Sequence, residues 1–250
     1  MADPIMIMMA QDTVIGDEPC CVSALAILRL QSWLSPAFPV GAYSYSHGLE
    51  WAVEAGLICD RKSLVEWLEA DLRFGSARND AIFFREAWRC TIEDNRKRLL
   101  KVAALAAAFR GTSELSLESS QQGSACLSTL RRAWPDRALD RLSELLRECD
   151  LQPALAVVLG IRSATQGIAA RIGLAAFLQG YVANLVNAGV RLIPLGQTDA
   201  QLAIAELENA VLAASKQAGK ATIEDLGSAA FMVDIASSAH ETQYTRLFRS

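Results

Sequence analysis

Histidine is scarce in this sequence, and no cysteine pair has the spacing of a metal site. The 250 residues include two histidines, His47 and His240, and six cysteines, none of which form a C-x-x-C motif. Zinc and other catalytic metals usually take three or four ligands from such residues. The sequence therefore predicts no metal site and no bound cofactor within one chain.

An excess of positive charge is also missing, and the first residues do not resemble a signal peptide. The net charge is −4, and the densest basic cluster, residues 96–101, follows Glu93 and Asp94. Such a cluster is typical of a solvated helix face, so we expect no nucleic-acid partner. The first residues carry Asp3 and Pro4 where a signal peptide carries basic residues. We therefore expect a cytoplasmic protein with reduced thiols and a flexible tail over residues 1–20.

Alternating strand patterns and internal repeats are absent, whereas apolar residues recur at helical spacing along most of the chain. Helices are expected near residues 22–34, 44–56, 63–75, 81–91, 99–109, 114–134 with a break at Gly123, 136–149, 160–190, 198–214 and 223–239. The sequence thus predicts an all-α, single-domain bundle of about ten helices over residues 21–239.

One apolar stretch raises the question of a membrane span. Residues 172–190 contain no charged side chain and lie between Arg171 and Arg191. Their length is marginal for the ~20 residues that a span requires, and Gln179 and Asn184 would meet lipid. The stretch favours a central helix that other helices approach closely, and we expect no membrane association.

Residues 35–50, SPAFPVGAYSYSHGLE, form the most unusual segment of the chain. Pro36 and Pro39 restrict the backbone, whereas Gly41 and Gly48 permit turns that other residues resist. No charged residue occurs before the last position. An extended, aromatic, uncharged segment leaves backbone polar groups without helix or sheet partners. We therefore expect it to be buried with substitute partners or held against another surface.

Part of this segment resembles the nucleophile elbow of a hydrolase, with Ser46 and His47 as the reactive pair. The elbow requires glycine where Ser44 stands, and it follows a strand that an all-α chain lacks. Serine hydroxyls that cap the next helix are the favoured interpretation, and a hydrolase is the alternative. Residues 216–222 also lack the first glycine and the final Ser or Thr of a phosphate loop.

The last residues, HETQYTRLFRS, form a second unusual segment. Tyr244, Leu247 and Phe248 stand at i, i+3 and i+4, and in a helix they would share one apolar face. Tyrosine and arginine often dominate the energetics of protein interfaces, which suggests a partner-binding tail over residues 240–250. A last helical turn packed on its own domain remains the other interpretation.

Three blocks in this sequence together resemble the UreF family of urease accessory proteins. Residues 35–50 are similar to its signature S-P-A-F-P-V-G-A-[FY]-S-[YH]-S-x-G-L-E. Residues 191–201, RLIPLGQTDAQ, resemble its second block, and residues 240–250 resemble its ending H-E-x-Q-Y-x-R-L-F-R-S. One departure is SSQQG at residues 119–123, where the family usually carries S-R-Q-x-G. The loss of that arginine weakens the argument for an arginine-dependent contact at this turn.

The resemblance implies an all-α protein without enzymatic activity that helps to assemble the nickel site of urease. Members of the family form homodimers, bind the accessory protein UreD (UreH) and recruit the GTPase UreG to the urease apoprotein. The resemblance places GTP hydrolysis and primary nickel binding on UreG. In the family, the ending becomes ordered on binding UreD, and the first signature contributes to the core and the surface that faces UreG. The candidate partner-binding residues are Pro36, Pro39, Gly41, Tyr43, Ser44, Tyr45, His47, Gly48, Glu50, His240, Glu241, Tyr244, Arg246, Leu247, Phe248, Arg249 and Ser250.

Overall fold

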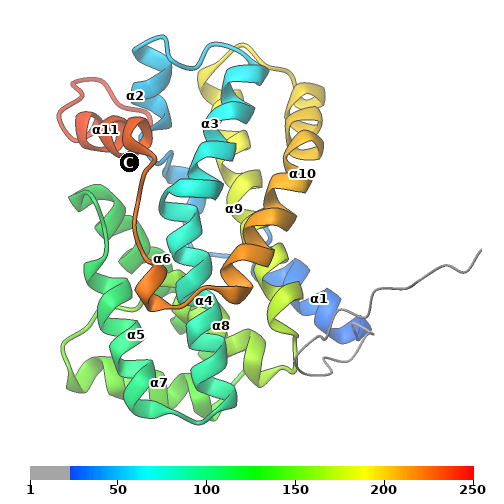
Figure 1. Cartoon of the computed structure of the whole chain (residues 1–250), viewed down its shortest axis with the longest axis vertical. Helices are drawn as coiled ribbons and strands as arrows, with labels where there is room; N and C mark the ends of the chain where they lie inside the picture. Colours follow the sequence, from blue (N-terminus) through cyan, green and yellow to red (C-terminus); the bar gives the residue numbers. More distant parts are fainter. Residues whose placement is uncertain (1–22) are drawn as a thin grey trace, which may run out of the picture.

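A computed structural model of this chain describes residues 23–250, and every regular element in that range is helical (Figure 1). The α-helices are α1 (Ala24–Trp33), α2 (Leu49–Glu54), α3 (Arg61–Phe74), α4 (Ser76–Ile92), α5 (Arg96–Ala108), α6 (Ser113–Ala133), α7 (Arg137–Glu148), α8 (Leu155–Thr165), α9 (Ala170–Leu192), α10 (Gln197–Lys220) and α11 (Phe231–His240). Two short 3-10 helices are η1 (Ala42–Ser44) and η2 (Ile223–Asp225). The prediction of an all-α fold is confirmed, and the predicted flexible tail lies outside the described residues.

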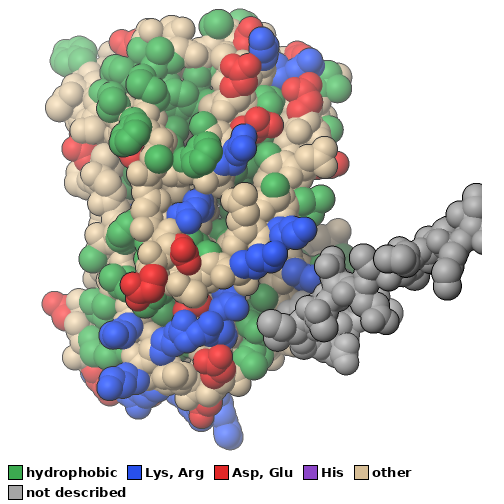
Figure 2. Space-filling view, in the orientation of Figure 1, with side chains coloured by type: hydrophobic (Ala, Val, Ile, Leu, Met, Phe, Trp, Pro, Cys, Tyr) green, Lys and Arg blue, Asp and Glu red, His purple; other side chains and the backbone are tan. Residues whose placement is uncertain are grey.

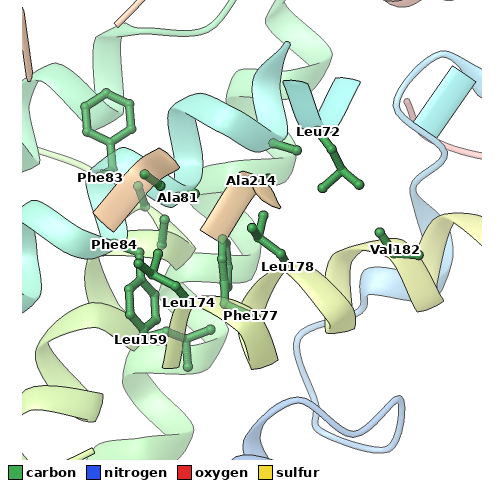
Figure 3. Close-up of a cluster of buried hydrophobic side chains, with 14 of the residues drawn as sticks. Leu72, Ala81, Phe83, Phe84, Leu159, Leu174, Phe177, Leu178, Val182 and Ala214 are labelled. Atoms are coloured by element: carbon green, nitrogen blue, oxygen red, sulfur yellow. The ribbon is translucent and has the colours of Figure 1, made fainter. Parts of the chain in front are cut away.

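The core forms where α4 packs against α8 and α9. Phe84 of α4 stacks on Phe177 of α9 with their ring centroids 5.4 Å apart, and Leu159 and Leu174 lie beside them (Figure 3). A Cβ atom on Gly160 of α8 would lie 2.3 Å from the carbonyl oxygen of Phe84. Because no real Cβ fits at that distance, glycine is what allows α8 to approach α4 so closely.

The apolar stretch at residues 172–190 lies within α9, which buries Leu174, Leu178, Val182 and Leu185 in the core. None of the helices in residues 23–250 has the length and apolar character needed to span a membrane. The prediction of one continuous helix over residues 160–190 was wrong. The chain turns between α8 and α9, where Gly167 has a φ of 65°.

Several predicted helix boundaries also differ from the structure. Helix α6 runs through Gly123 without a break, and a Cβ at that position would lie 2.0 Å from the Pro153 carbonyl oxygen, so the glycine permits close packing. Asp60 caps α3 by accepting a hydrogen bond from the Ser63 amide, so that helix starts earlier than predicted. Helix α10 continues to Lys220. The first part of the last predicted helix is η2 followed by non-helical chain, and α11 begins only at Phe231.

The carboxyl end of the chain lies toward one end of the fold, beside α2 (Figure 1). Figure 1 shows α11 next to α2 at one end of the molecule, with the C-terminus close to both. Apolar side chains gather at this end in Figure 2, whereas Lys and Arg side chains gather toward the opposite end, over α5 and α7. The two unusual sequence segments therefore meet at the apolar end of the fold.

Candidate partner-binding site

The loop between α1 and α2 contains several residues in the left-handed region. Gly41 has a φ of 73° and Gly48 a φ of 75°, and the non-glycine His47 between them has a φ of 54°. A Cβ on Gly48 would lie 2.5 Å from the amide nitrogen of Ser237 in α11. Glycine at position 48 is thus required both by the backbone conformation and by close packing on α11.

Side chains and backbone from distant parts of the chain bind the polar backbone groups of this loop. Asn184 of α9 donates to the Ala42 carbonyl at 3.1 Å, and Arg191 donates to the Tyr43 carbonyl at 2.7 Å. The Arg249 amide donates to the Ser44 carbonyl at 2.8 Å. The prediction that an uncharged loop needs substitute hydrogen-bond partners is confirmed.

The C-terminal tail, residues 241–250, packs directly on this loop. The Ser46 amide donates to the Ser250 carbonyl at 2.8 Å, and the Ser46 hydroxyl donates to the same oxygen. Phe248 is buried, and the guanidinium of Arg191 lies 4.3 Å from the centroid of its ring. Two segments about two hundred positions apart in the sequence therefore form one structural unit.

The Glu50 carboxylate, at the start of α2, holds the backbone of the tail. It accepts hydrogen bonds from the amides of Leu247, at 2.6 Å, and Phe248, at 2.9 Å. Its second oxygen also lies 3.2 Å from Nε2 of His240. A buried carboxylate of this kind is tolerated because each of its oxygens has a partner.

His240 connects Glu50 to α6. Its ring is fully buried, and Nδ1 lies 2.6 Å from a carboxylate oxygen of Glu114. The other oxygen of Glu114 accepts a hydrogen bond from Arg246 of the tail at 2.6 Å. Glu241 continues the contact by accepting a hydrogen bond from the Ser113 amide at 2.7 Å, so it caps the start of α6.

His47 occupies a second buried polar cluster that also contacts the tail. Its Nε2 atom lies 2.9 Å from Glu118, and its Nδ1 atom lies 3.2 Å from the hydroxyl oxygen of Tyr181. The other oxygen of Glu118 accepts a hydrogen bond from the Ser250 hydroxyl at 2.9 Å. Burial lowers the pKa of His47, but the carboxylates of Glu118 and Asp71 outweigh it, and the net pKa is raised.

Asp71 of α3 ends this cluster. Its carboxylate accepts hydrogen bonds from the Tyr181 hydroxyl and from the Ser76 amide, the latter at 2.8 Å. Burial raises the pKa of Asp71. Burial and the neighbouring Asp71 charge raise the pKa of Tyr181 well above its usual value. The cluster therefore links α3, α9, the loop and α6 through buried hydrogen bonds.

A cavity of about 330 Å³ lies beside His47, Glu118 and Tyr181 and extends toward Tyr43 and Pro36. The partly buried ion pair of Asp80 and Arg110, with atoms 2.8 Å apart, also lines it. Asp80 stands just before the predicted helix over residues 81–91, but it lies inside α4 because that helix begins at Ser76. Within residues 23–250, no group of three His, Cys, Asp or Glu side chains is placed to hold a metal ion.

The contacts of Ser46 and His47 do not form a catalytic pair. The Ser46 hydroxyl donates to the Ser250 carbonyl, while both ring nitrogens of His47 contact Glu118 and Tyr181. A nucleophilic serine needs a base within hydrogen-bond reach of its hydroxyl. The predicted serine cap is confirmed only in part, because the N-cap residue of α2 is Gly48, while the Ser46 hydroxyl accepts a hydrogen bond from the Glu50 amide in the first turn at 3.4 Å.

Comparison with known proteins identifies the family. The UreF family model matches residues 58–208, which extend from α3 into α10. A protein of Rhodopseudomonas palustris strain BisB5 is 48% identical over 225 residues, covering 90% of this chain and 91% of the relative. A protein of Bradyrhizobium diazoefficiens is 44% identical over 245 residues, covering 98% of this chain and 100% of the relative. Both relatives carry the name urease accessory protein UreF.

This chain belongs to the UreF family. A third relative, from Granulibacter bethesdensis, is 46% identical over 225 residues, covering 90% of this chain and 94% of its own. It has the same name, so the relatives are described as accessory proteins of urease. These matches include most of the chain and bear out the resemblance that the three sequence blocks indicated.

The candidate residues of this UreF-family chain divide into exposed and buried groups. The side chains of Tyr43 and Leu247 are 71% and 56% exposed, and Tyr244 is fully exposed. The buried candidates are Tyr45, His47, Gly48, Glu50, His240, Phe248 and Ser250, and Pro36, Pro39, Gly41, Ser44, Glu241, Arg246 and Arg249 are partly or fully exposed. The predicted helical face of Tyr244, Leu247 and Phe248 was wrong, because the tail is not helical and Phe248 alone is buried.

Sequence reasoning missed the partners of these residues, chiefly Asp71, Glu114, Glu118, Tyr181 and Arg191. Two of them break an apolar helix face, which is a signal that could have found them. Asp71 follows Leu64 and Leu68 on the buried face of α3, and Glu118 follows Leu115 on the buried face of α6. A carboxylate at such a position is rarely buried unless it has a partner.

Proposed function

We propose that this chain is a non-enzymatic scaffold that acts in the cytoplasm during insertion of nickel into urease. Its tail and α11 bind UreD (UreH), and the resulting complex recruits the GTPase UreG to the urease apoprotein. The chain acts as a homodimer, as the family resemblance implies. Membership of the UreF family supports the accessory role. The apolar surface described next supports the assignment of UreD as the partner of the tail and α11.

The observation that carries the assignment of UreD is an apolar surface at one end of the fold. Helix α11 exposes Phe231, Met232 and Ile235, and the tail exposes Tyr244 and Leu247. Apolar side chains gather at this end of the molecule in Figure 2. Exposed aromatic and aliphatic side chains on an element that is already ordered favour a protein partner, because binding then costs little conformational entropy.

The loop between α1 and α2 supplies a second contact surface, which binds UreG. Tyr43 is 71% exposed, while the Arg191 hydrogen bond to its carbonyl fixes the backbone beneath it. A tyrosine held out from a rigid loop is well suited to an interface. The buried candidates, among them Tyr45 and Glu50, shape the surface without being available to a partner.

Co-purification with UreD tests this proposal. Leu247→Asp places a charge on the apolar surface, and we expect it to reduce retention of UreD at least about tenfold, as a lost interface anchor does. The matched control is Leu212→Asp on α10, because Leu212 is 59% exposed and Leu247 is 56% exposed. Equal retention of UreD by both variants and the unmodified chain would exclude the tail as its binding site.

A further inference from the structure

Arg191, in the last turn of α9, contacts two of the segments that carry the family resemblance. Its guanidinium donates to the Tyr43 carbonyl of the loop at 2.7 Å and lies 4.3 Å from the centroid of the Phe248 ring in the tail. Arg191 is itself the first residue of the third such segment, residues 191–201. All three segments therefore meet at one side chain.

Two other residues of this third segment have roles that are local to the connection between α9 and α10. Asp199 accepts a hydrogen bond from the Gly196 amide at 3.2 Å and so caps the start of α10. Ile193 is buried in the core. Arg191 differs from them, because its contacts reach the loop and the tail, which the connection between the two helices does not require.

The loop that Arg191 contacts forms part of the wall of the cavity described above. Pro36, Val40 and Tyr43 all line this space of about 330 Å³. Packing behind the loop is therefore incomplete, unlike the close packing of a protein core. A segment with few packing contacts depends on its hydrogen bonds to keep one position.

The hydrogen bond from Arg191 fixes the backbone at the exposed tyrosine of the loop. A charged donor makes a hydrogen bond roughly twice as strong as a neutral one does, and the carbonyls on either side of Tyr43 accept from neutral donors. The ring of Phe248 in turn holds the guanidinium in place by a cation–π contact. Phe248 is buried, and its amide donates to Glu50, so the ring is itself fixed.

We propose that Arg191 is a positioning residue for UreG: it holds the backbone of Tyr43 so that the exposed side chain is ready to bind, and it acts through Tyr43 rather than through a contact of its own. This inference rests on the proposed function, in which Tyr43 contacts UreG. Without the donor, Tyr43 can move relative to the cavity. Binding of UreG then has to order the loop, and the cost in conformational entropy weakens it.

The test measures the dissociation constant of UreG for the complex of UreD with the full chain. Arg191→Met removes the donor and keeps an unbranched side chain, and it should weaken UreG binding at least about tenfold, as a lost charge-assisted hydrogen bond does. Arg191→Lys keeps a charged donor and should weaken it less. The matched control is Arg73→Met, because the Arg73 guanidinium also lies over a phenylalanine ring, 5.4 Å from the centroid of Phe74, outside the loop and the tail. UreD retention should be unchanged, since Glu50 still binds the tail.

A double-mutant cycle with Tyr43→Ala separates positioning from direct contact. If Arg191 acts through Tyr43, Arg191→Met should cause little further loss of UreG binding in the Tyr43→Ala background. Additive losses would overturn the proposal, because Arg191 would then contact UreG itself or support another residue. Arg191→Gln replaces Arg191→Met in the cycle if the latter does not fold.

The single variants distinguish failure of this inference from failure of the proposed function. Weak UreG binding by Tyr43→Ala together with full binding by Arg191→Met would refute the role of Arg191 alone. Full binding by Tyr43→Ala would refute the proposed UreG contact and the role of Arg191 with it. Loss of both UreD and UreG from folded Arg191→Met would mean that Arg191 supports the tail instead of Tyr43, which also overturns the proposal.

Discussion

At the scale of single residues, Gly48 allows the loop between α1 and α2 to pack closely on α11. Its φ of 75° lies in the left-handed region, where side chains other than glycine cost about 1–2 kcal/mol. A Cβ would also lie 2.5 Å from the Ser237 nitrogen, a backbone atom that cannot move without shifting α11. The sequence predicted a turn here from the glycine itself, but it held no sign of the close helix.

Gly48→Ala should lower the free energy of unfolding by about 2–4 kcal/mol, the sum of left-handed strain and overpacking. Gly41→Ala is the matched control, because Gly41 has a φ of 73° and a methyl group at that position would meet nothing within 4 Å. That control should lose only about 1–2 kcal/mol. Urea denaturation measures both variants, and equal losses would contradict a specific contact with α11.

At the scale of elements, a glycine within a helical sequence pattern can mark either the end of a helix or a close contact with another element. The sequence alone does not distinguish the two. Gly123 predicted a helix break, yet α6 is continuous, and Pro153 occupies the space that a side chain at this position would need. Gly160 lies inside α8 and permits its contact with α4. The periodicity of apolar residues was sufficient to predict the helices, but their ends depend on which other element lies close to each glycine.

The same substitution should therefore have opposite effects in two helices. Gly160→Ala places a methyl group 2.3 Å from the Phe84 carbonyl oxygen and should destabilise the protein by about 1–3 kcal/mol. Gly219→Ala in α10 has nothing within 4 Å and should stabilise by about 0.5–1 kcal/mol through helix propensity. Thermal unfolding measures the two changes, and the prediction fails if both have the same sign.

The tail shows why the candidate site was only partly predictable. Its sequence spacing suits a helix, but the tail is not helical, and Glu50 accepts hydrogen bonds from two consecutive tail amides. The acceptor lies about two hundred positions away in the chain. Local spacing identified the segment as unusual, whereas its conformation is set by carboxylates on α2 and α6.

At the scale of the whole molecule, the tail belongs to the fold and also exposes part of the proposed UreD surface. Phe248 and Ser250 are buried, and their contacts connect α2, α6 and α9. Tyr244 and Leu247 point into solvent from the same segment. Stability and partner binding should therefore depend on different residues of one tail.

Deleting residues 244–250 should preserve most helical circular dichroism, because the segment lies outside every helix. It should lower the free energy of unfolding by about 3 kcal/mol or more, since burial of Phe248 contributes about 2 kcal/mol and Glu50 loses two buried donors worth about 1–3 kcal/mol. The double variant Tyr244→Ser with Leu247→Ser keeps Phe248 and should unfold at nearly the urea concentration of the unmodified chain. An unchanged midpoint after the deletion would mean that the tail does not stabilise the folded protein, because its buried contacts would then contribute no net free energy.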